Sequence, residues 1–227
     1  MRWSNLAFLH WPVDAARLRR LVPAVLELDT FGGQAWLGIV PFRMEAVRLR
    51  LCPPVPGAHV FPELNVRTYV RHGERTGVWF FSLDAGSRLA VRGARFVYNL
   101  PYFDASMSMT PEGKGVAYAS ERVHDGAPSA RLRAAYGPAS EIYHAESGSL
   151  DHFLVERYCL FTRSRSGEMG FIDVHHLPWP LQRAAARLEV NTMAVAAGVE
   201  LPEQQPLVHF AHALEVVAWN RRPLKKT

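Results

Sequence analysis

FPELNVRTYV, residues 61–70, is the stretch on which the interpretation of the fold depends. Successive side chains of an extended strand point to opposite faces, so Glu63, Asn65, Arg67 and Tyr69 share one face, and the other face is apolar apart from a threonine. A polar face of this kind is commonly exposed to water. The alternative is a strand covered on both sides, whose polar face lines a pocket.

The neighbouring segments favour the covered arrangement. AWLGIVPF at 35–42 and VWFFSL at 78–83 are apolar on both faces, which is typical of strands buried on both sides. A short glycine-containing turn at 72–74 joins residues 61–70 to the second of these segments and predicts a hairpin. A strand between such partners is covered as well, and a buried Glu or Arg is costly unless it is paired or binds a ligand.

The rest of the sequence predicts a mixture of short strands and helices. We expect helices at 12–22, 87–99, 149–158 and 181–198, the second and third capped by Ser87 and Ser149. Hairpins or single strands are expected at 106–136, 159–164, 171–177 and 206–219. No linker or repeat interrupts the chain. The prediction is a single, mainly β (α+β) domain over residues 1–220, dominated by antiparallel sheet, and a flexible basic tail at 221–227.

Composition places the chain among globular proteins. Of its 227 residues 48% are hydrophobic and 21% charged, which is enough apolar material for a sizeable core. No apolar run is long enough to span a membrane, and the N-terminal segment lacks the features of a signal peptide, so we expect a cytoplasmic protein. Cys52 and Cys159 lie in no paired motif, and we expect both thiols to be free and buried.

The net charge of +5 comes from arginine, because the chain has three lysines among its 26 basic residues. A basic chain can bind nucleic acid, but these arginines are scattered through apolar segments. We therefore expect solvated or salt-bridged arginines and no nucleic-acid partner. Retention on DNA that falls with salt would indicate the contrary. Aromatic strand residues could equally form the interface of a homo-oligomer.

Several catalytic and metal-binding motifs are missing from the sequence. It contains no GxSxG elbow, no GK[ST] phosphate loop and no HExxH. Two ExxH spacings, Glu121–His124 and Glu141–His144, lie in extended segments rather than on facing helices, and we attribute them to chance. We expect neither a metal nor another cofactor.

A series of longer segments resembles a known family. WLGIVPFRM, PPVPG, FPELNVRTYV, GVWFFSLDA, YNLPYF, FLVERYCLF, HHLPWPLQ and LEVNTMAVAAGVELP follow one another between about residues 3 and 219. In this order they resemble the uncharacterised bacterial YqjF-like family, which is placed in the acetoacetate decarboxylase-like superfamily. The resemblance implies an antiparallel, cone-shaped β-barrel with peripheral helices and a pocket inside it.

The decarboxylases of that superfamily use a lysine that forms a Schiff base with a keto acid. The resemblance implies a position near 98–103 for this lysine, and that segment has none. Lys114 lies in a glycine-flanked turn, and Lys225 and Lys226 lie in the tail. Arginine cannot replace the lysine because it stays protonated. The sequence therefore does not support Schiff-base decarboxylation.

The resemblance still implies a pocket inside the barrel of this chain. It implies that Glu63, Asn65, Arg67 and Tyr69 line the barrel interior, with Tyr98 and Tyr102 near its mouth. Arg67 could bind a carboxylate or phosphate, and Glu63 could pair with Arg67 or act as a general base. We expect a small-molecule ligand, a carboxylated or keto metabolite. Any turnover would be lyase- or hydrolase-like acid–base chemistry without lysine. The alternative is a non-enzymatic binding or structural module in which the Glu63–Arg67 pair is architectural.

Overall fold

The polar strand lies inside a curved sheet. The computed structural model describes residues 1–47 and 59–224, and a sheet of 14 strands runs through them. The strand is β4 (Phe61–His72), and it forms the predicted hairpin with β5 (Arg75–Ala85). Gly73, with φ +58°, allows the tight turn between them. On its other side β4 pairs with β3 (Ala35–Glu45), so both of its edges are occupied.

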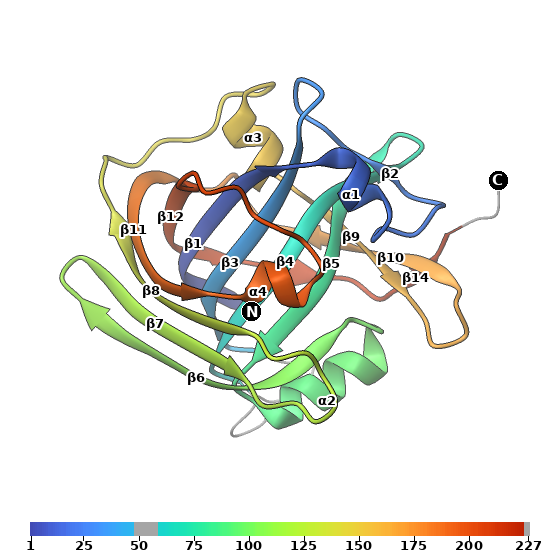
Figure 1. Cartoon of the computed structure of the whole chain (residues 1–227), viewed down its shortest axis with the longest axis horizontal. Coiled ribbons are helices and arrows are strands. Elements are labelled where there is room, and N and C mark those ends of the chain that lie inside the picture. Colours follow the sequence, from blue (N-terminus) through green and yellow to red (C-terminus); the bar gives the residue numbers. More distant parts are fainter. Residues whose placement is uncertain (48–58, 225–227) are drawn as a thin grey trace.

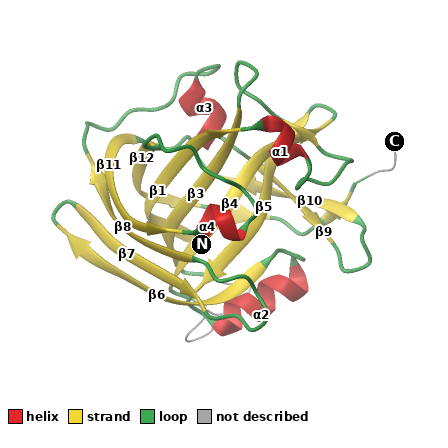
Figure 2. Cartoon of the chain, in the orientation of Figure 1, coloured by secondary structure: helices red, strands yellow, loops and turns green. Residues whose placement is uncertain are grey.

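The remaining elements surround these three strands (Figures 1 and 2). The other strands are β1 (Arg2–Val13), β2 (Glu27–Leu28), β6 (Tyr102–Glu112), β7 (Gly115–Arg122), β8 (Arg131–Pro138), β9 (Cys159–Arg163), β10 (Met169–His175), β11 (Gln182–Asn191), β12 (Leu207–Glu215), β13 (Val217–Ala218) and β14 (Arg222–Pro223). The helices are α1 (Ala15–Arg19), α2 (Arg88–Val97), α3 (Leu150–Val155) and α4 (Met193–Ala196). The first three helices begin at side chains that accept a backbone hydrogen bond, those of Asp14, Ser87 and Ser149.

Nine strands close into a ring in the order β5, β6, β7, β8, β11, β12, β1, β3 and β4, and the β4–β5 pairing completes it. Its interior is a large apolar core that includes Leu64 and Val66 of β4 together with Tyr118, Leu132 and Tyr136 of β7 and β8. All pairings around the ring are antiparallel except β5–β6, which is parallel. A closed ring removes the unpaired edges that an open sheet would present.

A second ring shares the β12–β1–β3–β4–β5 wall with the first. From β5 it continues through the parallel partner β9 to β10. β13 follows β12 after one residue and pairs with β10, which closes this smaller circuit. A second core lies on this side of the wall, and α2 and α3 contribute Val91, Leu154 and Val155 to it. Figure 1 shows α3 and α2 near opposite ends of the shared strands.

Several sequence-based expectations are confirmed by this architecture. The predicted helices at 12–22, 87–99 and 149–158 contain α1, α2 and α3, and the hairpin region 106–136 contains most of β6, all of β7 and the start of β8. Cys159 is a free, buried thiol, as expected. Cys52 and the proline-rich segment 52–57 lie outside the described residues.

Three expectations need correction. The helix predicted at 181–198 is wrong: β11 occupies most of this segment, and only the short α4 is helical. β1 was not predicted at all, although it pairs with both β3 and β12. The tail that we expected to be flexible from 221 is held in its described part, because β14 pairs with β10.

The helices within 1–47 and 59–224 are all too short or too polar to cross a membrane.

Candidate functional site

The polar face of β4 is covered, which answers the question raised by the sequence. Glu63, Asn65, Arg67 and Tyr69 are all buried, Glu63 with 2% and Arg67 with 7% of its surface exposed. Leu64, on the other face, belongs to the core of the nine-stranded ring. The four polar residues therefore face the second core, to which Tyr69 belongs. Their burial agrees with a strand covered on both sides, but they face the second core and not the interior of the nine-stranded ring.

Glu63 lies in an environment that favours its neutral form. The Tyr102 hydroxyl donates a 3.0 Å hydrogen bond to its Oε2. Burial raises the pKa of Glu63 to about 8, although the hydrogen bond from Tyr102 acts in the opposite direction. At neutral pH the carboxyl group is therefore largely protonated and can donate a proton. Catalytic carboxyl groups raised toward the working pH by burial are suited to general acid catalysis.

Arg67 is a buried cation without an acidic partner among the described residues. Its Nη2 donates to the Leu154 carbonyl oxygen of α3 at 3.3 Å, and its Nε has no hydrogen-bond partner. The guanidinium carbon lies 5.5 Å from the centre of the Phe8 ring. A guanidinium has five donors that fit carboxylates and phosphates. Arg67 thus retains the capacity to bind an anion.

His10 lies beside Arg67 in the neutral state. Tyr69 Oη is 2.8 Å from the Leu154 carbonyl oxygen and 2.6 Å from His10 Nε2. Because a carbonyl only accepts, Tyr69 donates to Leu154 and His10 Nε2–H donates to Tyr69. His10 Nδ1 then carries a lone pair, and none of the described residues bonds to it. Burial and the nearby Arg67 charge hold the pKa of His10 well below its ordinary value.

Unsatisfied polar atoms gather on this face of the sheet. Arg67 Nε, His10 Nδ1, Asn65 Oδ1 and His209 Nδ1 are all buried and have no hydrogen-bond partner among the described residues. Buried polar groups are normally bonded, and an unpaired one destabilises the fold by about 1–3 kcal/mol. A set of unpaired donors and acceptors on one buried face is the pattern expected of a site that binds a polar molecule.

Gly38 makes room for this arrangement. It pairs with His10 of β1 on one side and with Arg67 of β4 on the other. A Cβ atom at Gly38 would lie 3.2 Å from the His10 ring and 3.4 Å from Arg67 Cγ. The glycine therefore lets two polar side chains converge across three strands. A glycine inside the apolar run AWLGIV is a signal of close approach that our reading of the sequence did not use.

Residues from distant segments also reach the site, and the sequence did not reveal them. His209 of β12 lies with its ring centre 6.4 Å from that of His10, and its Nε2 is 3.1 Å from Asp151 Oδ1 of α3. His10 was missed because β1 was not predicted. His209 lies on the predicted strand 206–219, but nothing in the sequence brings it close to β4.

The predicted Glu63–Arg67 pair is wrong. Glu63 bonds to Tyr102 and Arg67 to Leu154, and no ion pair joins them. The two residues are four positions apart on a regular strand, which separates their Cα atoms by roughly 13 Å at about 3.3 Å per residue. Asn65 lies between them on the same face. The two ionisable groups therefore belong to opposite ends of the polar face.

The two predicted tyrosines lie at the Glu63 end. Tyr102 is buried and bonded to Glu63. Tyr98, half buried at the C-terminal end of α2, packs against the second core and is close enough to Tyr102 to affect its pKa. Lys114 is exposed in the turn between β6 and β7, and Lys225 and Lys226 lie outside the described residues. In residues 1–47 and 59–224, no three His, Cys, Asp or Glu side chains are grouped to hold a metal.

Comparisons of the whole chain show which proteins share this fold. The chain is 15% identical to acetoacetate decarboxylase from Legionella pneumophila, with a TM-score of 0.63 over 99% of this chain and 86% of the other. It is 13% identical to an acetoacetate decarboxylase-like enzyme from Sphingomonas wittichii RW1, with a TM-score of 0.62 over 100% and 92% of the two chains. The enduracididine biosynthesis enzyme MppR gives a TM-score of 0.65 at 11% identity, over 98% and 87%. The predicted fold class, an acetoacetate decarboxylase-like β-barrel with few helices, is confirmed.

Sequence similarity gives a closer relationship. The chain is 48% identical over 224 residues to the uncharacterized protein YqjF of Bacillus subtilis (strain 168), covering 99% of this chain and 90% of the relative. The model of the DUF2071 family, described as an uncharacterized conserved protein, matches residues 1–215. The predicted family is thereby confirmed: the chain belongs to the DUF2071 family and is a relative of YqjF.

Proposed function

We propose that the polar face of β4 binds a small carboxylate, with Arg67 as the group that holds the anion. The observation that carries this proposal is the buried guanidinium, which bonds to the Leu154 carbonyl oxygen and to the Tyr69 side chain but has an unpartnered Nε and no acidic partner among the described residues. An uncompensated buried cation is strongly destabilising. A carboxylate bound through two parallel hydrogen bonds would both neutralise the charge and satisfy its donors.

The rest of the face suits the other end of such a ligand. Asn65 Oδ1 and His10 Nδ1 have no partners within residues 1–47 and 59–224 and can accept hydrogen bonds from a hydroxyl or amide group. The protonated Glu63 lies at the opposite end of the face from Arg67, so it can donate a proton only to the part of a ligand that extends past Asn65. We therefore propose a keto or hydroxy acid as the ligand class. Any turnover would proceed by acid–base chemistry at Glu63, without a lysine Schiff base.

A structural neighbour is consistent with this ligand class. MppR has been solved in complex with pyruvate, a keto acid. That likeness concerns the fold alone at 11% identity, so the argument for this chain rests on its own Arg67 and Glu63. The alternative of a purely structural module drew its support from a Glu63–Arg67 pair, which is not formed.

The test compares the wild-type protein, Arg67→Met and Arg133→Met by thermal unfolding and calorimetry with pyruvate and acetoacetate. Arg133 is exposed on β8, so its replacement makes the same charge change far from β4. A ligand that binds the folded state raises the melting temperature. We expect an increase for the wild type and Arg133→Met and none for Arg67→Met.

The melting temperature without ligand supplies a second criterion. Removing an unpaired buried charge should leave Arg67→Met as stable as the wild type or more stable. Equal binding of these acids by the wild type and Arg67→Met would contradict the proposal. So would an Arg67→Met protein that unfolds far more readily without ligand, because the arginine would then be architectural.

A further inference from the structure

A surface cleft rich in arginine lies beside α2, apart from the polar face of β4. It consists of two adjoining hollows of about 370 and 510 Å³, which share Arg95 and Arg165. Arg163 borders the first hollow and Arg92 the second. We call this feature the arginine cleft and define it by these four residues. Volumes of this size are typical of sites for small molecules.

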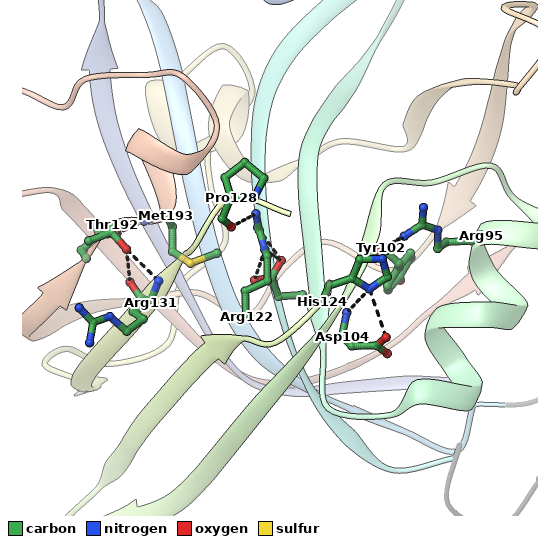
Figure 3. A network of polar contacts seen from close by, with 11 residues as sticks. Arg95, Tyr102, Asp104, Arg122, His124, Pro128, Arg131, Thr192 and Met193 are labelled. Atoms are coloured by element: carbon green, nitrogen blue, oxygen red, sulfur yellow. Dashed lines mark hydrogen bonds and ion pairs between the residues drawn. The ribbon is translucent and has the colours of Figure 1, made fainter. Parts of the chain in front are cut away.

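The positive charge in the arginine cleft is largely uncompensated. Arg92, Arg163 and Arg165 are exposed and make no ion pair within the described residues. Asp104 is the one acidic residue among the described lining residues. Its Oδ2 lies 3.1 Å from His124 Nδ1 (Figure 3), whereas its Oδ1 is buried and has no hydrogen-bond partner among the described residues, so this one carboxylate faces three unpaired arginines. Clefts lined by one sign of charge concentrate ions of the opposite sign.

The walls between the arginines are apolar. Trp79, Leu100, Pro101 and Phe161 line the first hollow. Phe96 lines the second and leaves 82% of its surface exposed. A large exposed aromatic ring beside cationic groups can stack on a flat ligand. The cleft thus combines several guanidinium groups with aromatic surface.

Hydrogen bonds hold the cleft in shape. Arg95 Nη1 donates to the Tyr102 carbonyl oxygen at 2.9 Å and lies 3.0 Å from His124 Nε2, contacts that Figure 3 shows. Thr162 Oγ1 donates to the Tyr98 carbonyl oxygen at 3.1 Å, which ties β9 to the end of α2. Pre-formed walls reduce the entropy lost when a ligand binds.

From these features we propose that the arginine cleft binds a small phosphate ester with an aromatic portion. A phosphate monoester carries nearly two negative charges at neutral pH and three acceptor oxygens, which suits several guanidinium groups better than a single carboxylate does. The aromatic portion lies against the apolar wall. This site differs from the polar face of β4, which is buried and has one arginine, and the proposal does not depend on the function proposed there.

The test is calorimetric titration with 1-naphthyl phosphate, inorganic phosphate and 1-naphthol. Arg163→Gln/Arg165→Gln removes two exposed arginines of the cleft and leaves Arg95 and its structural hydrogen bonds intact. The control, Arg131→Gln/Arg133→Gln, makes the same charge change at two exposed positions of β8. We expect the wild type and the control to bind 1-naphthyl phosphate alike, and the cleft variant to bind it at least about tenfold more weakly.

The other two probes separate the parts of the site. Inorganic phosphate should bind more weakly than the ester, because it lacks the aromatic contact. 1-Naphthol should show no dependence on the arginines. Equal affinities of the cleft variant and the control for the ester would overturn the proposal. So would a wild type that does not bind the ester, or one that binds inorganic phosphate just as tightly as the ester.

Discussion

Two ionisable residues on β4 are buried without neutralising each other, and each has a different consequence. Glu63 can give up its charge by taking a proton, and its raised pKa reflects this. Arg67 cannot, because a guanidinium stays protonated. The charge of the carboxyl group therefore depends on pH, whereas the arginine stays positively charged at every pH and is stabilised only by an anionic partner.

The first prediction concerns Glu63 and pH. Its pKa is about 8 in the folded protein, against 4.5 for the unfolded reference, so the folded state binds more protons between these values. The free energy of unfolding should therefore fall as pH rises from about 4.5 to about 8, by a few kcal/mol from this group. Urea denaturation of the wild type and Glu63→Gln at pH 5 and pH 9 measures this contribution.

The variant should lose most of that pH dependence, since glutamine does not titrate. Glu74→Gln, at an exposed position in the turn after β4, is the control and should keep the wild-type profile. A Glu63→Gln protein whose stability follows pH as steeply as the wild type would show that Glu63 is ionised in the folded state.

The second prediction concerns Gly38. An alanine Cβ would press on the His10 ring at 3.2 Å and on Arg67 Cγ at 3.4 Å. We expect Gly38→Ala to lower the free energy of unfolding by about 1–3 kcal/mol, as overpacked cores do. Gly93→Ala, on α2 with open space around its Cβ, should instead raise it by up to about 1 kcal/mol. Urea denaturation of both variants measures these changes. An unchanged free energy of unfolding for Gly38→Ala would contradict this interpretation.

The sequence allowed a partial prediction at this scale. Alternation along β4 identified the residues that share its polar face, because a regular strand has a fixed period. It did not identify their partners. His10, Leu154 and His209 come from segments far away in the sequence, and only the pairing of β1 with β12 and the position of α3 bring them together.

At the scale of elements, β11 shows why local propensity failed. Its alanine-rich sequence favours a helix, yet the segment pairs with β8 and β12 and is extended. Ala184, Ala186 and Leu188 pack against the core, while the residues between them are exposed. This period of two was present in the sequence, but alanine contributes too little hydrophobic contrast to make it visible. Tertiary pairing decided the structure.

A buried ion pair joins two elements of the nine-stranded ring and supplies the third prediction. Arg122 of β7 binds Asp84 of β5 through Nε and Nη2, at 3.1 and 2.8 Å, and its Nη1 bonds to the Pro128 carbonyl oxygen (Figure 3). Arg122→Met should lower the free energy of unfolding by about 3–5 kcal/mol, because it leaves the Asp84 carboxylate buried and unpaired.

The matched control is Arg71→Met, which breaks an exposed ion pair with Glu27 and should cost at most about 1 kcal/mol. Replacing both partners, in Asp84→Leu/Arg122→Met, should recover much of the loss. A chemical denaturation series that found Arg122→Met and Arg71→Met equally mild would contradict a structural role for the buried pair.

For the whole molecule, the shared wall means that each core depends on both rings. The β12–β1–β3–β4–β5 wall separates the two cores and is covered on both faces, and for this reason β3 and β5 contain apolar runs, whereas β4 alternates because its polar residues lie on one covered face. That pattern predicted strands covered on both sides, whereas the barrel class was implied by the resemblance to the YqjF-like family. The closure of the smaller ring could not be predicted, because β13 is two residues long and carries no pattern of its own.

The fourth prediction tests that closure. Truncation after Asn220 removes β14, and truncation after Val216 also removes β13. Both strands pair with β10, and the backbone N–H of Trp219, next to β13, donates to the Asp173 carbonyl oxygen at 3.0 Å. We expect a graded loss of stability, larger for the shorter protein, together with aggregation through the freed edge of β10. Melting temperatures and light scattering would measure both effects. Two truncated proteins of wild-type stability would show that β13 is dispensable.

The pairing of β1 with β12 has a consequence for the newly made chain. These strands lie near the two ends of the described chain, and both belong to the shared wall. During synthesis from the N-terminus, β1 and β3 emerge long before the strand that covers the other edge of β1. Neither ring can close until residues 207–215 leave the ribosome. Until then the apolar N-terminal strands have an unpaired edge and can aggregate, which is the condition under which chaperones are most needed.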